Sequence, residues 1–437
     1  MKKNGDAVTI VAAILLIGTL HTQISSQTPF SINKRLKVIG KHLCNAQDYP
    51  IQLRGMSTHG LQWFRDCITE ESINVLADTW GADIVRLSMY VREDGYVTDP
   101  EYYKQLIDGY VDDILANGLY CLLDWHHLHN GDPNTDIEYA KDFFEHMSEK
   151  HGQKGHVLYD ICNEPNGKEV TWDVVKQYAN QIIPIIREND PQSVIIVGTP
   201  HWALDLMSVV GNELSYENIL YTLHFYAADH KDTIRNVLKE ALSHDLPVFV
   251  TEFGTQESSG DGPNDFVSSQ TWLDLLAENK ISWCNWNYSD DFRSGAVWEQ
   301  GTCNSGNWSD SNLKESGKWI KARINDPPDD FVNTPVKHSP RQSGTLAYTM
   351  FLFPNPFTKS ITISFPQTPA GNKKITVAVY SSSGKCVYTQ TVSSTQGAVT
   401  WNGVSDIGRE VQSGLYFVRA TIDNNETLIK SVVHCKE

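Results

Sequence analysis

The sequence predicts a (β/α)8 barrel, the TIM-barrel fold, followed by a small all-β sandwich. Three observations predict this architecture. Eight apolar runs alternate with amphipathic segments between about residues 51 and 290, polar side chains gather at the C-terminal ends of these runs, and the composition changes after Ile324. The chain has 437 residues, more than one domain usually holds, so two domains are the first expectation.

The eight predicted strands are nearly continuous in apolar residues, as strands buried on both faces of a parallel sheet are. They are residues 52–58, 83–90, 119–126, 157–164, 194–200, 219–226, 247–254 and 281–288. Eight β–α units in roughly 250 residues are what a barrel of this kind requires. A doubly wound sheet is the alternative, but no glycine-rich phosphate loop follows the first predicted strand.

Segments with helical periodicity lie between the predicted strands. Apolar residues recur at i, i+3, i+4 and i+7 from Ile73 to Trp80, and again from Ile107 to Ile114. The second segment runs into an Asn-Gly pair at 117–118, which is a usual signal for the end of a helix. Both segments are therefore predicted to be helices that cover the barrel.

The region after the barrel has a different character. A polar, proline-bearing linker is predicted over 326–345, between a barrel at 30–325 and a β-rich domain at 346–437. Short alternating strands with Gly, Asn and Ser turns predict a sandwich of about 90 residues there. The predicted strands lie in 360–366, 374–392, 398–403 and 413–422.

Residues 1–27 are predicted to be a secretory signal peptide. Lys2 and Lys3 precede an apolar run that is too short for a comfortable transmembrane span, and small residues follow it. A retained N-terminal anchor is the alternative. We therefore expect a protein that is extracellular or attached to the cell surface.

Charge and cysteine usage narrow the function classes. The formal net charge is -17 with no Lys/Arg-rich tract, which argues against nucleic acid or an anionic membrane as the main partner and suits a neutral substrate. The eight cysteines form no CxxC pair, so disulfides are allowed and zinc spacing is absent. Cys121 and Cys162, inside apolar strands, are predicted to be buried thiols.

Polar and aromatic side chains mark the C-terminal ends of the predicted strands. In a barrel these ends converge on one face, the face that carries active sites. The strand-end residues are His59, Arg86, His126, Asn163, Glu164, His224, Tyr226, Glu252 and Trp286. Because seven of the eight strands contribute one, an active site is predicted rather than isolated structural groups.

Two of these residues, Glu164 and Glu252, end the fourth and seventh predicted strands. A retaining glycosidase needs one protonated carboxylic acid and one carboxylate about 5–5.5 Å apart. We expect Tyr226 and Arg86 to hold Glu252 ionised, and Asn163 to bind a sugar 2-hydroxyl. The simpler alternative is a structural salt bridge in the barrel mouth.

Other chemistries are less well supported. His126, His127 and His129 cluster, but adjacent side chains on a strand diverge and no HExxH motif or Cys partner completes a metal site. No G-x-S-x-G nucleophile elbow is present. We therefore expect neither a metal nor an organic cofactor. Trp63 and Trp286 are predicted to stack on sugar rings, with ordinary core packing as the alternative.

These motifs resemble those of glycoside hydrolase family 5. Asn163-Glu164-Pro165 and Thr251-Glu252-Phe253-Gly254 carry the likeness. RGMSTHGLQW (54–63), VRLSMY (85–90), LLDWHHL (122–128), HFYA (224–227) and WCNW (283–286) are similar to the family's bacterial cellulase-type endoglucanases. The resemblance covers about residues 30–325.

The resemblance implies a role for each site residue. Glu164 would be the acid/base and Glu252 the nucleophile. The implied supporting residues are Arg86, His126, Asn163, His224 and Tyr226, and the implied sugar contacts are His59, Trp63, Tyr90 and Trp286. Relatives commonly place a lysine and a glutamate shortly after the last of these tryptophans, whereas this chain has YSDDFRS at 288–294. Asp290, Asp291 and Arg293 are the candidates to replace them.

The expected function is therefore that of a secreted, monomeric, retaining endo-β-1,4-glucanase acting on cellulose and related β-glucans. A β-mannanase or a mixed-linkage β-glucanase on the same core is the nearest alternative. A glucan-binding surface protein without catalysis is the alternative from another class.

The C-terminal region has a likeness of its own. LFPNPF (352–357), YSSSGK (380–385), WNG (401–403) and SGLYFVRA (413–420) resemble the sorting domains recognised by the type IX secretion system. This implies the type IX secretion machinery as a partner. A carbohydrate-binding module is the weaker alternative, because Trp401 is the only tryptophan of this region and no row of aromatic residues is evident.

Overall fold

The computed structural model describes residues 28–325, 350–353, 357–365, 373–381, 385–393, 397–422 and 426–435. The chain divides into two compact units, Met1–His338 and Ser339–Glu437. The predicted signal peptide and linker lie outside the described residues. Among the residues that are described, no helix is long and apolar enough to cross a membrane.

The first unit is built on eight parallel strands that close into a barrel in the order β10-β3-β4-β5-β6-β7-β8-β9. They are β3 (Arg54–Thr58), β4 (Ile84–Tyr90), β5 (Tyr120–His126), β6 (Val157–Asp160), β7 (Ile195–Val197), β8 (Ile219–Tyr226), β9 (Val248–Gly254) and β10 (Trp283–Tyr288). Each strand lies within one of the eight predicted runs, so the predicted barrel is confirmed.

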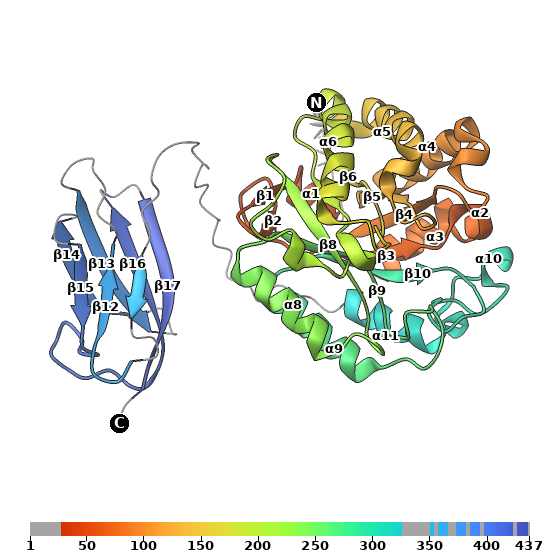
Figure 1. Ribbon diagram of the computed structural model, residues 1–437. Coiled ribbons are helices and arrows are strands. Elements are labelled where there is room, and N and C mark those ends of the chain that lie inside the picture. Colours follow the sequence, from red (N-terminus) through yellow and green to blue (C-terminus); the bar gives the residue numbers. More distant parts are fainter. Residues whose placement is uncertain are drawn as a thin grey trace, which may run out of the picture. The chain divides into compact units, whose positions relative to one another are not determined.

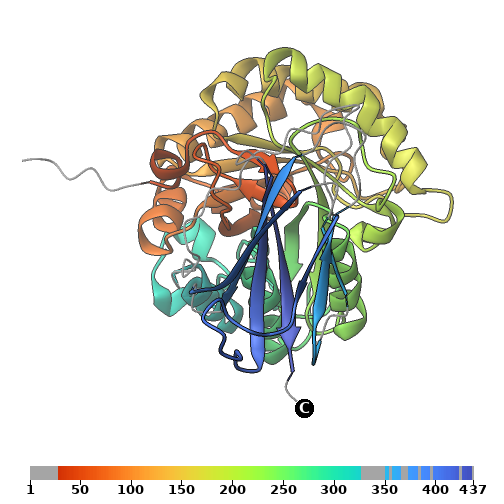
Figure 2. The same ribbon diagram turned by 90° about the vertical axis from the view of Figure 1, so that its left-hand side faces the viewer.

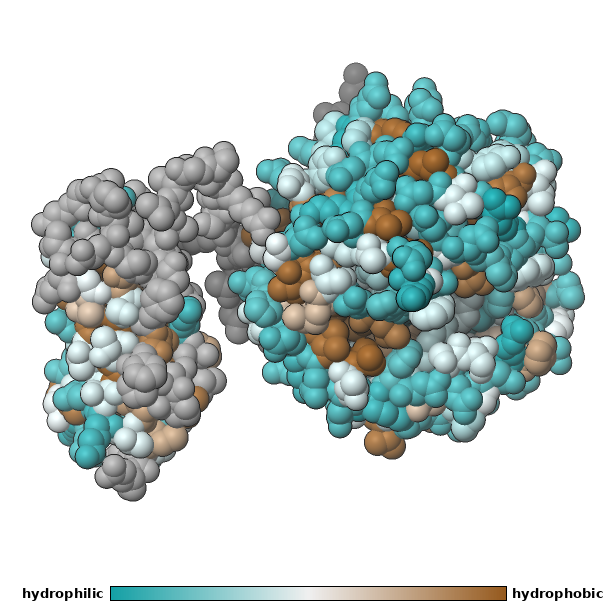
Figure 3. Space-filling model, in the orientation of Figure 1, coloured by the Kyte–Doolittle hydropathy of each residue, from teal (hydrophilic) through white to brown (hydrophobic). Residues whose placement is uncertain are grey.

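Helices surround the strands on the outside of the barrel (Figures 1 and 2). The longer ones are α4 (Pro100–Ala116), α5 (Ile137–His151), α6 (Trp172–Asn189), α8 (Asp232–Ser243), α9 (Phe266–Glu278) and α11 (Glu315–Ile324). The short ones are α1 (Pro29–Asn33), α2 (Leu61–Phe64), α3 (Glu70–Asn74), α7 (Pro200–Ala203) and α10 (Thr302–Ser305). The face of this unit seen in Figure 3 is mainly hydrophilic, with apolar residues grouped in smaller patches.

The two helices predicted from periodicity turn out differently. α4 ends as predicted, with Asn117 as C-cap and Gly118 at φ +68°. The segment from Ile73 to Trp80 is not one α-helix, because α3 gives way to a π-helical turn over Val75–Thr79. Trp80 then packs against Tyr288 and Trp298, so burial of the indole is kept while the helix geometry changes.

Apolar side chains fill the barrel interior near the N-terminal ends of its strands. Leu122, Leu158, Leu220 and Phe249 belong to one buried cluster, which Leu43 of the N-terminal hairpin also joins. The hairpin consists of β1 (Lys37–Ile39) and β2 (His42–Cys44). It packs against the barrel at the N-terminal ends of the strands, opposite the end that carries Glu164 and Glu252.

Both ends of the described barrel unit are anchored near the N-terminal ends of the strands. The Phe30 amide donates to the carbonyl of Gly118, just before β5, over 2.9 Å. At the other terminus, Arg54 at the start of β3 donates to the carbonyl of Arg323 over 2.7 Å. The Asn325 side chain donates to the carbonyl of Thr79, ahead of β4, over 3.3 Å.

Strand β9 has a bulge, where it carries one extra residue relative to the paired stretches of β8 and β10. Its register with β8 pairs Phe249 with Thr222 but Glu252 with His224, so three steps on β9 match two on β8. The register with β10 shifts at the same place. Such a bulge breaks the alternation of side chains. As a result two successive residues, Thr251 and Glu252, both bond to groups inside the barrel.

The second unit consists of two antiparallel sheets. One has the order β11-β12-β15 and the other β14-β13-β16-β17. The strands are β11 (Phe351–Phe353), β12 (Ile361–Ser364), β13 (Lys374–Ser381), β14 (Cys386–Ser393), β15 (Ala398–Trp401), β16 (Gly414–Ile422) and β17 (Glu426–His434). The prediction of an all-β domain is confirmed, although β11 and β17 were not predicted. Trp401 is fully buried in the core and offers no surface for a sugar.

Candidate active site

The structure brings the predicted site residues together at the C-terminal end of the barrel. One carboxylate oxygen of Glu164, one of Glu252 and one ring nitrogen of His224 lie within 4.8 Å of one another. Each other predicted residue contacts another member of the set. These are His59, Trp63, Arg86, Tyr90, His126, Asn163, Tyr226 and Trp286.

Glu252 is held by two donors, one for each carboxylate oxygen. The Tyr226 hydroxyl donates to Oε1 over 2.6 Å, and Nη1 of Arg86 donates to Oε2 over 2.9 Å. Its side chain is 5% exposed. Charge-assisted hydrogen bonds of this kind favour the ionised carboxylate and fix its rotamer. The bulge in β9 is what turns this side chain into the barrel.

Arg86 is fully buried among three carboxyl groups. In addition to Glu252, Nη2 lies 2.9 Å from Asp124 Oδ2 and Nε lies 3.5 Å from Asp160 Oδ2. Burial, followed by the charge of Asp124, raises the pKa of Asp160 well above its usual range. The Asp160 carboxyl group therefore favours its neutral form beside the Arg86 guanidinium.

Asp124 and Asp160 were not among the residues predicted from the sequence. The available signal was a single charged residue inside each of two otherwise apolar strand runs, LYCLLDWH and VLYDICNE. A buried charge requires a partner. The partner here is Arg86 on β4, which is next to the strand of Asp124 and two strands from that of Asp160.

Asn163 is held at both ends of its amide. Its Oδ1 accepts from Arg86 Nη2 over 2.7 Å, and its Nδ2 lies 3.4 Å from His126 Nε2. His126 Nδ1 is 2.7 Å from Asp124 Oδ2, so the ring donates there and its Nε2 is the acceptor. The His126 ring also stacks on Tyr90, with centroids 4.1 Å apart. One amide hydrogen of Asn163 remains for a ligand.

Glu164 has a different environment from Glu252. Its Oε1 lies 2.8 Å from His224 Nδ1, whereas Oε2 makes no hydrogen bond to any described residue. Burial raises the pKa of Glu164 to about 7, against the opposing influence of His126 and Arg86. Burial also lowers the pKa of His224 to about 3, so this ring is neutral. The Glu164 carboxyl group is thus partly protonated near neutral pH, as a general acid requires.

Aromatic side chains form the walls beside these groups. Trp286 is nearly buried and stacks on His126 with centroids 5.3 Å apart, whereas Trp63 is 49% exposed and contacts His59 and Tyr90. Burial lowers the pKa of His59 to about 3, so this ring is also uncharged. Flat aromatic rings beside uncharged histidines suit a neutral ligand such as a sugar.

Trp202 is a further exposed aromatic residue that was not predicted from the sequence. Its backbone N–H donates to the carbonyl of Pro165 over 3.1 Å, next to Glu164, and its side chain is 52% exposed. Its φ of +58° is costly for a residue with a side chain, and such strain is often retained at binding sites. The signal was its position after the fifth strand, comparable to that of Trp63 after the first.

The segment after β10 contains Asp290, Asp291 and Arg293, the candidates to replace the lysine and glutamate of the relatives. Asp290 Oδ2 accepts from the amides of Gly301 and Cys303 over 2.9 and 3.1 Å, which fixes the loop backbone. Asp291 lies 3.8 Å from His59 Nε2 and accepts from Arg293 over 3.0 Å. Of the three candidate replacements, Asp291 is therefore the one in contact with a predicted sugar-binding residue.

A disulfide joins Cys67 to Cys303, 236 residues apart in the sequence. It links the short helical turn Arg65–Cys67 to α10. The other six cysteines are free, and Cys121 and Cys162 are buried thiols. The pairing could not be deduced from the sequence because eight cysteines without a spacing motif allow many connectivities.

Replacing both Cys67 and Cys303 with serine is expected to lower the free energy of unfolding of the barrel by about 2–5 kcal/mol, because the unfolded chain loses a long cross-link. Guanidinium denaturation followed by tryptophan fluorescence would measure it. The control is Cys386→Ser, which changes an exposed free thiol. Equal midpoints for the double variant and the control would contradict the expectation.

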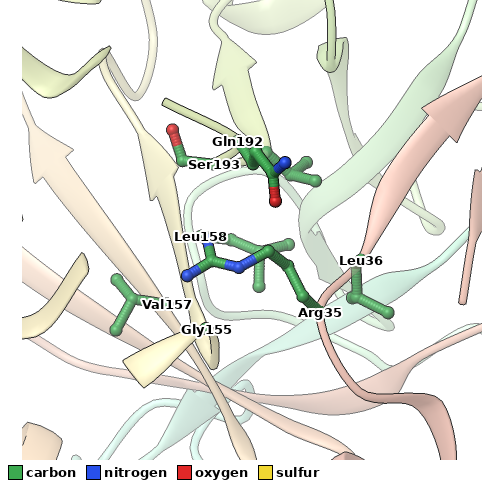
Figure 4. A pocket seen from close by; sticks show the side chains of 8 residues that line it. Arg35, Leu36, Gly155, Val157, Leu158, Gln192 and Ser193 are labelled. Carbon is green, nitrogen blue, oxygen red and sulfur yellow. The ribbon is translucent and has the colours of Figure 1, made fainter. Parts of the chain in front are cut away.

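A shallow pocket at the opposite end of the barrel contains none of the predicted site residues (Figure 4). It lies where Val157 begins β6 and is lined by Arg35 and Gln192, among others. Arg35 pairs with Asp190 at 2.6 Å, which makes it part of the closure of the barrel. The candidate active site is therefore the end that carries Glu164 and Glu252.

Comparison with known families decides the identity of this unit. Residues 44–292 match the model for cellulase (glycosyl hydrolase family 5). The chain belongs to glycosyl hydrolase family 5. The resemblance inferred from its motifs is thereby confirmed.

Curated relatives of this family 5 protein support the same assignment. It is 47% identical over 306 residues to endoglucanase MaCel5A of Microbulbifer sp., which covers 68% of this chain and 59% of the relative. It is 49% identical over 311 residues to endoglucanase E-5 of Thermobifida fusca, covering 69% and 66%. An endoglucanase of Clostridium saccharobutylicum is 40% identical over 318 residues, covering 72% and 71%. The family 5 chain thus spans less than two thirds of the first two relatives.

Solved structures resemble the barrel unit. The catalytic domain of Thermobifida fusca endoglucanase Cel5A in complex with cellotetraose has a TM-score of 0.66 and 48% identity, and the match covers 68% of this chain and 99% of that one. The cellulase Cel5C_n has a TM-score of 0.68 and 43% identity, covering 69% and 95%. The match is therefore to whole catalytic domains.

The C-terminal unit of the family 5 protein has its own match. Residues 351–434 fit the model of a secretion-system C-terminal sorting domain. The predicted sorting domain is confirmed, and it marks the protein as secreted or displayed at the cell surface.

Proposed function

We propose that this family 5 protein is a retaining endo-β-1,4-glucanase that cuts internal bonds of cellulose and related β-glucans. The observation that carries the proposal is the approach of Glu164 and Glu252, each with a carboxylate oxygen within 4.8 Å of the other. Retaining enzymes hold their two carboxyl groups about 5–5.5 Å apart, whereas inverting enzymes need about 6.5–9.5 Å for an intervening water. The endoglucanase names of the relatives support the choice of glucan.

In this mechanism Glu252 is the nucleophile and Glu164 the general acid/base. The ionised carboxylate of Glu252 attacks the anomeric carbon while Glu164 gives its proton to the glycosidic oxygen, and a covalent glycosyl-enzyme forms. Glu164, now a carboxylate, takes a proton from water, which attacks the anomeric carbon and releases Glu252. Neither step requires a metal or an organic cofactor.

Different residues around the two glutamates bind different parts of the substrate. The free amide hydrogen of Asn163 binds the 2-hydroxyl, a contact that strengthens in the transition state. Trp286 and Trp63, with His59 and Tyr90, bind the sugars on the nucleophile side. Trp202 lies beside the acid/base segment and stacks on a sugar of the leaving group.

A time course by NMR tests the stereochemistry and the substrate together. We expect the β-anomer as the first product from carboxymethylcellulose and from barley β-glucan, and little reaction with mannan. The α-anomer as first product would show an inverting enzyme. Preference for mannan would show a mannanase, and binding without cleavage would show a glucan-binding protein.

The alkaline side of the pH profile is expected to report Glu164. Because its pKa is about 7 and the protonated form is the acid, kcat/KM on glucan should fall about tenfold per pH unit above that value. The control is a dinitrophenyl cellobioside, whose leaving group needs no proton, and its rate should persist to higher pH. Identical profiles for the two substrates would contradict this assignment.

We further propose that residues 30–325 contain all of the catalytic machinery, that the enzyme acts as a monomer, and that the C-terminal domain is recognised by the type IX secretion machinery. A chain ending at Asn325 is expected to keep its activity on soluble glucan and its binding to insoluble cellulose, since the barrel closes its own sheet. In the native host, the shortened enzyme should remain inside the cell envelope. Loss of cellulose binding with export intact would indicate a binding module instead.

A further inference from the structure

A chain of buried hydroxyl groups reaches the acid/base residue from inside the barrel. His224 Nδ1 lies 2.8 Å from Glu164 Oε1, and His224 Nε2 lies 2.9 Å from Thr251 Oγ1. Thr251 Oγ1 is in turn 2.7 Å from Thr222 Oγ1. Thr222, Thr251 and His224 are all buried. We call these three residues the hydroxyl relay.

The donors and acceptors of the relay fit in one direction. A neutral imidazole has one N–H, so His224 must donate at one nitrogen and accept at the other. Thr222 Oγ1 already accepts from the Thr251 amide over 3.2 Å. If the Thr222 hydroxyl donates to Thr251 and Thr251 donates to His224 Nε2, every hydrogen has an acceptor. In the reverse direction the Thr222 hydroxyl hydrogen has none among the described residues.

We propose that Thr251 is a positioning residue that fixes His224 as the tautomer protonated at Nδ1, and thereby keeps the proton of Glu164 on Oε2. With Nδ1–H donating to Oε1, that oxygen accepts and cannot carry the proton toward the ring. Oε2, which has no partner among the described residues, then holds the proton that the substrate receives. The proposal rests on the acid/base role of Glu164.

The relay exists because of the bulge in β9. With regular alternation Thr251 and Glu252 would point to opposite faces of the strand. The extra residue lets Thr251 contact His224 while Glu252 contacts Tyr226 and Arg86. Strand β9 thus carries Glu252 itself, and through Thr251 and His224 it also positions Glu164.

The charged and titratable groups around the relay come from four strands and one loop. The groups that face Glu164 or His224 are Arg86 on β4, Asp124 and His126 on β5, Glu252 on β9, and His230 after β8. Asp160 on β6 also forms a hydrogen bond with Thr251. Because burial raises the pKa of Asp160 well above its usual range, its protonated carboxyl group donates to Thr251 Oγ1 and leaves the Thr251 hydrogen for His224 Nε2. None of these groups is an alternative partner for His224 Nε2.

The variant that tests the proposal is Thr251→Val, which removes the hydroxyl but keeps the shape. On cello-oligosaccharides we expect kcat/KM to fall about tenfold, a part of the usual contribution of a general acid. When His224 no longer donates steadily to Glu164, the pKa of Glu164 should rise. The fall of kcat/KM on the alkaline side of the pH profile should then begin at higher pH. Dinitrophenyl cellobioside should be cleaved at the wild-type rate, because its departure needs no acid and Glu252 is unchanged.

Two further variants separate positioning from packing. Thr251→Ser restores the hydroxyl and should restore the wild-type pH profile. Thr199→Val makes the same substitution at a buried residue whose hydroxyl donates to the carbonyl of Thr222 and does not reach His224. Thr199→Val should leave the rates on both substrates and the pH profile unchanged. Equal losses on both substrates in Thr251→Val, or a profile that Thr251→Ser does not restore, would overturn the proposal.

A measurement that does not depend on activity completes the test. Nitrogen-15 NMR of labelled histidine should show His224 as the Nδ1–H tautomer in the full-length protein, and a mixture of tautomers in Thr251→Val. The Nε2–H tautomer in the wild type would overturn the relay whatever the enzyme does. An Nδ1–H tautomer in a protein that cleaves no glycoside would instead overturn the proposed function and leave the relay intact.

Discussion

Glu252→Ala is expected to reduce kcat on every glycoside by about 10⁴-fold or more, because no other group can form the covalent intermediate. Glu164→Ala should behave differently. It should lose activity on glucan by about 10²–10⁴-fold, the usual contribution of a general acid, but retain much of the first step on dinitrophenyl cellobioside. Burst kinetics on that substrate would separate the two steps.

Azide provides the matched control for the two glutamates. In Glu164→Ala, azide should attack the glycosyl-enzyme and give the β-glycosyl azide. In Glu252→Ala, azide should occupy the space of the missing carboxylate and give the α-glycosyl azide. The reverse pattern would exchange the two roles, while rescue of neither variant would argue against the double displacement.

Arg86→Leu is expected to have the largest effect on stability. Removing the guanidinium leaves Glu252 and Asp124 buried without their cation, and breaking a buried pair costs about 3–5 kcal/mol. Activity should also be lost, since Glu252 and Asn163 both lose a donor. Urea denaturation monitored by circular dichroism would measure the change in the free energy of unfolding.

Arg293→Leu is the control for this experiment. Arg293 also pairs with an aspartate, Asp291, but its side chain is 43% exposed, and an exposed pair contributes less than about 1 kcal/mol. The contradicting outcome is a free energy of unfolding that falls no further in Arg86→Leu than in Arg293→Leu. That result would mean that the buried carboxyl groups become neutral in the variant, and that Arg86 mainly fixes their side-chain conformations instead of compensating their charge.

Much of the fold follows from patterns that are local in the sequence. Eight apolar runs contain all eight barrel strands, and an Asn-Gly pair marks the end of α4. The π-helical turn at Val75–Thr79 was not predictable, because i, i+3, i+4 spacing does not distinguish it from an α-helix over so short a segment. Strand β17 was missed because the polar Glu426 and Lys430 interrupt its apolar alternation.

The site was predictable where its residues end strands and unpredictable where they depend on pairing between strands. Glu164 and Glu252 interrupt apolar runs at their ends, a signal visible in the sequence. Asp124 and Asp160 lie inside such runs, and their role depends on Arg86, which is one strand away from Asp124 and two strands away from Asp160. The contact of Thr251 with His224 depends on a register shift, which no single strand reveals.

The anchoring of both termini near the N-terminal ends of the barrel strands has a consequence for an enzyme carried to the cell surface. Phe30 and Asn325 are bonded near the starts of β5 and β4, whereas Glu164 and Glu252 stand at the finishing ends of their strands. The described part of the barrel unit therefore ends at Asn325, on the side of the barrel away from the catalytic groups. For the proposed action on cellulose, a solid that cannot diffuse to the enzyme, an attachment made at Asn325 does not occupy the end of the barrel that carries Glu164 and Glu252.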